Sequence, residues 1–315
     1  MKKIISIPDI PSDVISNYES FSIERVGDIS RKGMLEKLSG CNGIIAGDTI
    51  TYDQDFFAQA DSLEVISRFG VGVDNVDIEA AESNGVAVTN VPGANAESVA
   101  EHTIGLMIAV SKNFVKSDTE MRDGNWVRDY GKGLELANKT LGQIGFGNVG
   151  SLVALKSSLA FNMNLLVYDP YVPDYEVYNT VYGEKTPLNH LLQESDFISV
   201  NLPLTEETQD MLGADEFKVM DEDAILVNTG RGEVVVEEDL ATALKKDEIF
   251  GAGLDVLRNE PTGDQNPLFD APRTVLTPHA ASHTLEVFRR VAETVLRDQE
   301  AVFDGRKPRN IKHSA

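Results

Sequence analysis

Four polar residues in the C-terminal half of the sequence could together carry acid–base chemistry on an anionic substrate. Arg231 lies in a glycine-flanked loop after a predicted strand, and its guanidinium could hold a carboxylate through two parallel hydrogen bonds. Asp255 ends a second predicted strand and could accept a hydrogen bond from a carboxamide or cap a helix. Glu260 precedes a proline, and His279 follows a third predicted strand. An isolated histidine is typical of a structural position, but an imidazole paired with a carboxylate can exchange a proton near neutral pH.

The middle of the chain carries a Gly-x-Gly-x-x-Gly motif, formed by Gly145, Gly147 and Gly150. A predicted buried strand runs into the motif, a predicted apolar helix leaves it, and a second predicted strand ends on Asp169. Such glycines let the backbone approach a pyrophosphate, the helix N-terminus favours its charge, and the acid accepts from the ribose hydroxyls. Because Asp169 would repel a 2′-phosphate, the pattern predicts NAD rather than NADP. The alternative is a glycine turn in an ordinary strand–helix–strand unit.

Parallel sheets must bring such residues together, and the alternation of short apolar strands with helices predicts two α/β domains of unequal size. In the N-terminal third we expect strands at 3–7, 44–46, 65–67 and 86–88, and helices at 12–16, 32–38, 53–60 and 77–84. From the glycine motif onward we expect strands at 140–144, 165–168, 197–200, 224–227, 251–254 and 274–276, and helices at 149–159, 188–193, 215–219, 237–246 and 282–303. The second domain is therefore predicted to hold a doubly wound sheet. Ligands of such sheets bind at the carboxyl ends of the strands, where the polar residues named above fall.

A long helix is predicted over Ala96–Val115, and it is apolar nearly all round. A helix of this kind must be buried on more than one side. It is either a central core helix or a helix that also packs against a second copy of the chain, and we expect a homodimer formed through it. A polar, glycine-rich stretch follows it at 123–139.

The net charge of −23, from 51 acidic and 28 basic residues, argues against nucleic acid or an anionic membrane as a partner. A saline habitat is one alternative explanation of the acidity. There is no apolar run long enough for a membrane span and no expected leader, and the single Cys41 fits a reducing compartment, so a cytoplasmic location is predicted. No His and Cys cluster has metal-ligand spacing, so no metal is expected. Among the histidines, the settings of His102, His190, His283 and His313 are not comparable to that of His279.

The sequence resembles the D-isomer-specific 2-hydroxyacid dehydrogenases, and within them most closely the short D-3-phosphoglycerate dehydrogenases. The motifs that carry the resemblance are FGVGVDNVD at 69–77, NVPG at 90–93, ESVAE at 97–101, the glycine motif, NTGRG at 228–232, GLDV at 253–256 with Glu260-Pro261, and TPH at 277–279. The resemblance implies an α/β fold of two Rossmann-like domains. A doubly wound cofactor domain at 99–285 would be inserted into a smaller flavodoxin-like substrate domain at 1–98 and 286–315.

The resemblance also implies NAD as the cofactor and a catalytic triad of Arg231, Glu260 and His279. Cofactor contacts are then expected from Val71, Gly145, Gly147, Asn148, Val149, Gly150, Asp169, Leu202, Pro203, Thr229, Gly230, Arg231, Asp255, His279 and Ala281. Substrate contacts are expected from Arg68, Gly70, Val71, Gly72, Arg128, Arg231 and His279. In these roles Arg231 holds the substrate carboxylate, His279 exchanges the proton of the C2 hydroxyl, and Glu260 orients His279.

The substrate that the resemblance favours is 3-phosphoglycerate, oxidised to 3-phosphohydroxypyruvate for serine biosynthesis. Arg68 and Arg128 match phosphate-binding positions of the family, but a third such position is Gly47, followed by Asp48. The alternative is a reductase of glyoxylate, hydroxypyruvate or another 2-oxo acid. A non-enzymatic NAD-sensing protein is a more remote alternative, against which the complete triad argues. No regulatory domain is expected after the closing helix.

Overall fold

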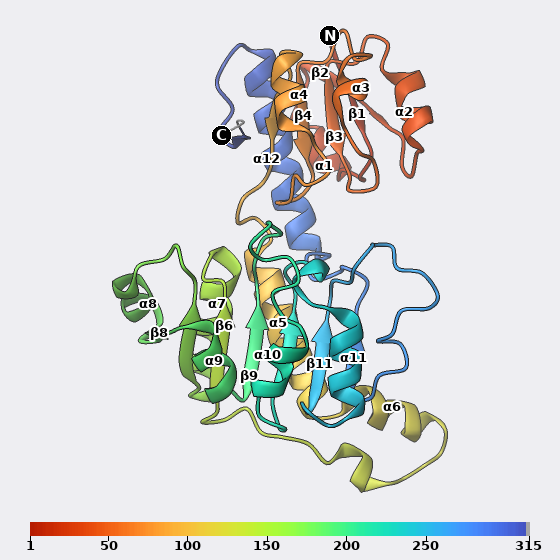
Figure 1. Ribbon diagram of the computed structural model, residues 1–315. Helices are drawn as coiled ribbons and strands as arrows, with labels where there is room; N and C mark the ends of the chain where they lie inside the picture. Colours follow the sequence, from red (N-terminus) through yellow and green to blue (C-terminus); the bar gives the residue numbers. More distant parts are fainter. Residues whose placement is uncertain (313–315) are drawn as a thin grey trace. The chain divides into compact units, whose positions relative to one another are not determined.

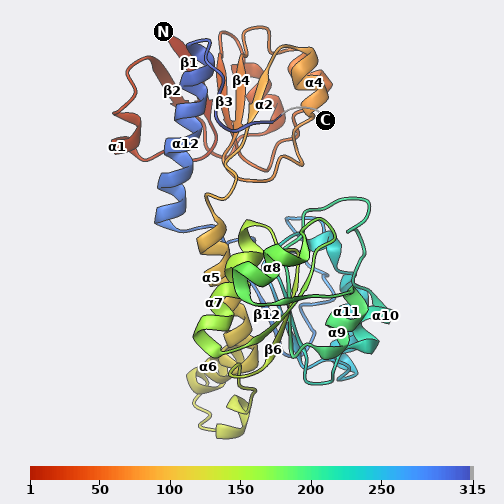
Figure 2. The ribbon, with the colours of Figure 1, turned by 90° about the vertical axis from the view of Figure 1, so that its left-hand side faces the viewer.

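The computed structural model describes residues 1–312, which form two compact α/β units (Figure 1; Figure 2). Unit 1 combines Met1–Asn95 with the residues from His283 onward, and unit 2 is Ala96–Ser282. The units divide at 95/96 and 282/283, so the predicted boundaries at 98/99 and 285/286 each lie three residues too late in the sequence. The predicted fold class is confirmed, because each unit holds a largely parallel sheet with helices on both faces. His313 lies outside the described residues.

The sheet of unit 1 has six strands in the order β13-β5-β4-β3-β1-β2. They are β1 (Lys2–Ser6), β2 (Phe21–Arg25), β3 (Gly43–Ala46), β4 (Val65–Arg68), β5 (Ala87–Thr89) and β13 (Ile311–Lys312). All neighbours are parallel except β13, which runs antiparallel to β5. Without β13 the order is the 2-1-3-4-5 of flavodoxin-like sheets.

Helices cover both faces of this sheet because successive strand residues point to opposite sides. The helices are α1 (Ser12–Ile15), α2 (Arg31–Lys37), α3 (Gln54–Phe57), α4 (Ile78–Ser83) and α12 (Leu285–Phe303). Ile4 and Ile45 are buried on one face with α1 and α12. Ile5 and Ile44, their chain neighbours, are buried on the other face with α2, α3 and α4.

Unit 2 has a seven-stranded, wholly parallel sheet in the order β12-β11-β10-β9-β6-β7-β8. Its strands are β6 (Thr140–Ile144), β7 (Asn164–Tyr168), β8 (Glu184–Lys185), β9 (Phe197–Val200), β10 (Ile225–Asn228), β11 (Gly251–Leu254) and β12 (Thr274–Leu276). Counted from β6, this is the Rossmann order 3-2-1-4-5-6 with a further strand at one edge. The order reverses between β6 and β9, so a ligand site is expected beyond their carboxyl ends.

The two faces of this sheet bury separate cores. The helices of unit 2 are α5 (Ala96–Ser111), α6 (Phe114–Arg122), α7 (Asn148–Phe161), α8 (Asp174–Val181), α9 (Leu188–Glu194), α10 (Ala214–Val219) and α11 (Glu237–Lys245), with 3₁₀ turns η1 (Arg128–Gly131) and η2 (Gly232–Val234). One core gathers α5, α7 and α8, and the other gathers α9, α10 and α11. None of the helices in residues 1–312 combines the length and apolar character that a membrane crossing requires.

The prediction of one helix over Ala96–Val115 was wrong. The chain forms α5, turns at Asn113 in the left-handed conformation with φ 52°, and begins α6 at Phe114. Asparagine tolerates this conformation better than most residues, and the apolar run through Val115 conceals the turn in the sequence. The predicted closing helix also begins later, at Leu285, after a Thr284 cap. The edge strands β2, β8 and β13 were not predicted, because these short strands carry little hydrophobic periodicity. The helix α8 was also not predicted.

Candidate active site

A glycine cradle lies where β6 passes into α7. Gly145 has φ +86°, and a Cβ there would lie 2.6 Å from the carbonyl oxygen of Asn201. A Cβ on Gly150 would lie 2.0 Å from the carbonyl oxygen of Gly145, so this helix can pack against its loop only with glycine. A Cβ on Gly147 would meet nothing within 4 Å, so the loop leaves open space in front of the helix. The three glycines thus serve turn, approach and packing, as in dinucleotide sites.

The charges around this cradle suit NAD. The first-turn N–H groups of α7, from Asn148 and Val149 onward, have no intrahelical acceptor and can receive a pyrophosphate. At the end of β7, Asp169 accepts from the backbone N–H groups of Phe146 (2.8 Å) and Tyr171 (2.9 Å). These bonds fix the carboxylate beside the glycine loop, and each oxygen keeps a lone pair for a ribose hydroxyl. The described residues therefore fit a dinucleotide.

The predicted proton-transfer pair is assembled in unit 2. Nδ1 of His279 lies 2.5 Å from Oε2 of Glu260, whose Oε1 accepts from the backbone N–H of Leu257 at 2.9 Å. The hydrogen bond to Glu260 raises the pKa of His279, while burial and the nearby Arg231 lower it. Because the carboxylate holds a proton on Nδ1, the other ring nitrogen, Nε2, is left to exchange a proton with a substrate.

Asp255 anchors the segment that carries His279. Its side chain is 1% exposed, and it accepts from the Thr277 hydroxyl (2.5 Å) and the backbone N–H groups of Ala280 and Ala281 (both 2.9 Å). The carbonyl oxygen of Asp255 accepts from the N–H of His279 at 2.7 Å. His279 has φ 51°, an unusual conformation for a residue with a side chain, and these bonds hold it there. The structure gives Asp255 a positioning role, and its contact with a cofactor stays a prediction.

Arg231 stands on a loop that the side chain of Asn228 shapes. Asn228 donates to the carbonyl of Arg231 (2.8 Å) and accepts from the N–H of Gly230 (2.9 Å). A Cβ on Gly230 would lie 2.9 Å from the carbonyl oxygen of Leu202, so the loops after β9 and β10 pass each other closely. Leu202 is buried and Pro203 exposed there. The loops after β6, β7, β9, β10, β11 and β12 thus place the predicted catalytic and cofactor residues of unit 2 at one edge of the sheet.

The predicted substrate residues of unit 1 form a loop after β4. Arg68 is buried and donates from Nε to the Gly72 carbonyl (3.0 Å) and from Nη1 to the Ala46 carbonyl (2.9 Å). Asn90 donates to the carbonyl of Val71 at 2.6 Å. These bonds occupy the carbonyl oxygens of Val71 and Gly72, and binding of an anion by the loop stays a prediction. Arg68 therefore supports the loop, and its contact with a substrate phosphate stays a prediction.

Arg128 is not brought together with His279 within one chain. It is exposed in η1, beside α6, and the segment after η1 is held to the C-terminal end of α5 by a bond from the N–H of Leu134 to the Ser111 carbonyl (2.8 Å). The opposite end of α5 contacts the Ala281 carbonyl through Ser98 (2.6 Å). Thirteen helical residues separate the two ends, which is about 20 Å.

Comparison with known proteins agrees with this geometry. The family model described as D-isomer specific 2-hydroxyacid dehydrogenase, NAD binding domain, matches residues 104–281, more than half of the chain. The chain belongs to this family. The match confirms the predicted family and NAD as the cofactor.

Two relatives and one solved structure show the range of this 2-hydroxyacid dehydrogenase family around the chain. It is 36% identical to D-3-phosphoglycerate dehydrogenase of Methanocaldococcus jannaschii, over 99% of this chain but only 59% of that protein. It is 37% identical to glyoxylate reductase of Korarchaeum cryptofilum, over 90% of this chain and 86% of that protein. The crystal structure of the TT0316 protein of Thermus thermophilus superposes with a TM-score of 0.91 at 32% identity, covering 98% of this chain and 99% of that one.

Two residues of this dehydrogenase domain that the sequence did not single out lie behind the proton-transfer pair. Nε2 of His102, on α5, lies 3.0 Å from the Thr277 hydroxyl and 3.4 Å from the Asp255 carboxylate. Glu237, at the start of α11, accepts from the N–H of Arg258 (2.6 Å) and from Nδ2 of Asn266 (2.7 Å). Both belong to helices whose periodicity accounts for them as ordinary helical residues, so only the folded structure reveals their contacts.

Proposed function

We propose that this chain is an NAD-dependent oxidoreductase that interconverts a 2-hydroxy acid and the corresponding 2-oxo acid. The observation that carries the proposal is the 2.5 Å contact between Nδ1 of His279 and Oε2 of Glu260. The contact lies at the same sheet edge as the glycine cradle and the Arg231 loop. Bound NAD would supply the hydride acceptor for oxidation, and NADH the donor for reduction.

The protein residues divide the remaining work. During oxidation, Nε2 of neutral His279 takes the proton of the C2 hydroxyl while hydride leaves C2, and during reduction the protonated ring returns it. Glu260 keeps the proton on Nδ1 and stabilises the imidazolium that forms. Arg231 holds the substrate carboxylate and polarises the C2 oxygen. The expected contact of Gly70, Val71 and Gly72 with a substrate stays a prediction.

The structure favours a small, unphosphorylated acid over 3-phosphoglycerate. A phosphate dianion requires clustered cations, and Arg128, one of the two expected to bind it, lies near the end of α5 opposite to the His279 segment. The third position at which the family carries a phosphate-binding arginine is Gly47 here, and a Cβ added to it would lie 3.2 Å from Cγ2 of Ile7. Glyoxylate and hydroxypyruvate therefore become the preferred substrates, and 3-phosphoglycerate with its role in serine biosynthesis becomes the alternative.

A substrate and cofactor panel tests the activity. NADH oxidation, followed by absorbance, should be fastest with glyoxylate or hydroxypyruvate and slower with 3-phosphohydroxypyruvate and pyruvate. NADH should exceed NADPH in kcat/KM by about tenfold, or about 1.4 kcal/mol, because Asp169 repels a 2′-phosphate. No turnover of any 2-oxo acid would overturn the proposal and favour the NAD-sensing alternative. A clear preference for the phosphorylated substrate would restore phosphoglycerate.

We also infer a homodimer, for which the arm that follows α5 provides support. Phe114, Val115 and Trp126 are 54%, 53% and 76% exposed, an apolar group that is unusual on a protein with this charge. Light scattering should show that Phe114→Ser with Val115→Ser produces a monomer. Leu159→Ser, at a leucine on α7 that is 78% exposed, should leave the dimer intact. A cytosolic location stays a prediction.

A further inference from the structure

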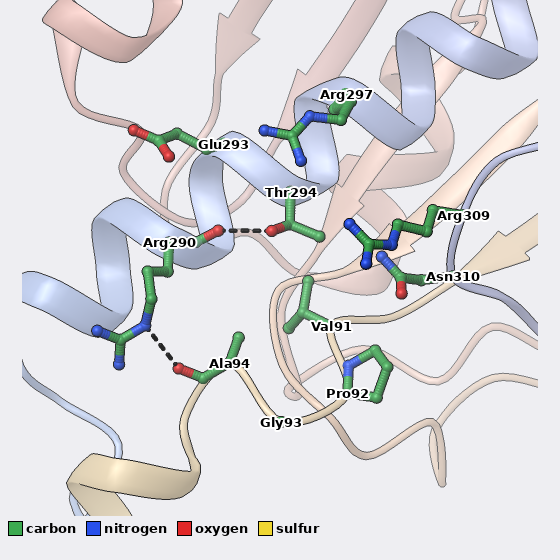
Figure 3. Close-up of a pocket in the computed structure, with 10 residues that line it drawn as sticks. All are labelled: Val91, Pro92, Gly93, Ala94, Arg290, Glu293, Thr294, Arg297, Arg309 and Asn310. Atoms are coloured by element: carbon green, nitrogen blue, oxygen red, sulfur yellow. Dashed lines mark hydrogen bonds between the residues drawn. The ribbon is translucent and has the colours of Figure 1, made fainter.

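A pocket of about 390 Å³ lies within unit 1, away from every residue assigned a role above. Its walls are the segment 91–94, one face of α12, and the residues 309–310 that lead into β13 (Figure 3). Three of its lining residues are arginines: Arg290 and Arg297 on α12, and Arg309. In a chain whose net charge is −23, such a gathering of positive charge requires an explanation.

Two of the three arginines face one space, and the third lies beside it. Figure 3 shows the guanidinium groups of Arg297 and Arg309 pointing toward the same space beside Thr294. Arg290 lies on the other side of Thr294, with its Nε donating to the Ala94 carbonyl at 3.0 Å. Arg290, Thr294 and Arg297 follow a four- and three-residue spacing on α12, which places them on one helix face.

None of these three arginines forms an ion pair within residues 1–312, although acidic residues are nearly twice as numerous as basic ones. Their neighbours behave differently: Arg289 pairs with Asp13 and Glu293, and Arg306 with Asp304. Glu293 is the acid that lines the pocket, and its carboxylate turns away from the arginines, toward Arg289 (3.7 Å). The positive charge of the pocket is therefore not neutralised from within the described protein.

A buried carboxylate holds the third arginine in place. Asp298, on α12, is 2% exposed and accepts from the backbone N–H of Arg309 (3.0 Å) and from Nδ2 of Asn310 (2.9 Å). The backbone that carries Arg309 is thus fixed to α12, which keeps this arginine beside the arginines of α12. Arranging like charges in advance costs stability unless an anion repays it.

We propose that this pocket binds a small phosphate-bearing anion with at least two negative charges. Guanidinium groups match phosphate oxygens through paired N–H donors, and two of them facing one space, with a third at the rim of the pocket, suit a di- or trianion better than a single carboxylate. The volume suits a small metabolite, and the acidity of the rest of the chain argues against a nucleic acid. The site is distinct from the glycine cradle and does not depend on the proposed reaction.

Calorimetric titration with pyrophosphate tests the proposal. The protein is saturated with NAD, so that the glycine cradle is filled, and the buffer contains about 0.15 M NaCl to screen distant charges. We expect saturable binding of one pyrophosphate per chain. Arg297→Gln with Arg309→Gln should weaken it at least tenfold. Arg306→Gln removes the same charge from unit 1 outside the pocket, where Arg306 pairs with Asp304, and it should change the affinity by less than about twofold.

The outcomes separate cleanly. Absence of saturable binding, an equal loss in Arg306→Gln, or full affinity in the double variant would each overturn the proposal. Thermal unfolding of every variant establishes that it is folded. If the double variant does not fold, Arg309→Gln alone decides, because its side chain forms no hydrogen bond or ion pair with residues 1–312. That single variant should weaken binding by at least about threefold, and unchanged affinity would count against the site.

Discussion

The two partners of the proton-transfer pair are held by different kinds of anchor. The segment that carries His279 is fixed by Asp255, which is buried at 1% exposure and receives three hydrogen bonds within five residues of chain. The segment that carries Glu260 is fixed by Glu237, which receives one bond near each end of the stretch from Arg258 to Asn266. Between those two points most residues are exposed.

This difference indicates that His279 must be positioned more accurately than Glu260. His279 exchanges the proton with the substrate, and an error of about 1 Å in such a group can cost about a hundredfold in rate. Glu260 acts only through His279, so a looser anchor suffices. The loss of activity on substitution should therefore decrease in the order His279, Asp255, Glu260, Glu237.

His279→Asn should cause the largest loss. Asparagine keeps a polar group of similar reach but cannot exchange a proton near neutral pH, so kcat should fall by about a hundredfold to ten-thousandfold. Steady-state kinetics with the best substrate of the panel measures this. The dissociation constant of NADH, measured by calorimetry, should change by less than about threefold, which separates a chemical defect from a binding defect. Activity within tenfold of wild type would remove His279 from its proposed role.

Asp255→Asn should come second. The amide NH₂ that replaces one oxygen cannot accept from the N–H of Ala280 or Ala281, and a buried donor without an acceptor costs about 1–3 kcal/mol. We expect the free energy of unfolding to fall by that amount and kcat to fall by about ten- to a hundredfold, because His279 loses its support. Denaturant unfolding and kinetics on the same sample check both. Loss of stability without loss of kcat would show that Asp255 does not position His279.

The sequence predicts much of this arrangement, but not the anchors. The glycine motif, the strand ends and the His279–Glu260 pair follow from local patterns, since carboxyl ends of parallel strands must meet at one edge. Glu237 was predicted only as part of a helix, because its partners lie 21 and 29 residues away in an irregular segment without periodicity. Arg68 was interpreted from its family position, and its hydrogen bonds to two backbone carbonyls are contacts that no sequence pattern displays.

Glu260→Gln should be milder and should reveal itself through pH. Glu260 is the main cause of the raised pKa of His279, so the amide should let that pKa fall toward its ordinary value of about 6.5. Oxidation requires neutral His279, and its rate therefore rises with pH through this pKa. The profile of kcat/KM for oxidation should shift to lower pH in the variant, with a loss of about tenfold at the optimum. An unmoved profile, with the chemical step rate-limiting, would break the pairing.

Glu237→Gln should have the smallest effect on activity, about two- to threefold, because the amide oxygen can still accept from the N–H of Arg258.

The effect of Glu237→Gln on stability should depend on pH. Burial raises the pKa of Glu237 in the folded protein, so the wild type loses stability as pH rises from the unfolded pKa of about 4.3 through the folded value. Glutamine carries no charge, so the variant should lack this loss. Urea unfolding should therefore show that the free energy of unfolding of the variant, relative to that of the wild type, increases as pH rises from 4 to 7. A difference that stays constant over this range would show that Glu237 is not desolvated as the structure indicates. A loss of kcat as large as that of Asp255→Asn would show that both anchors matter equally, and the comparison between them would fail.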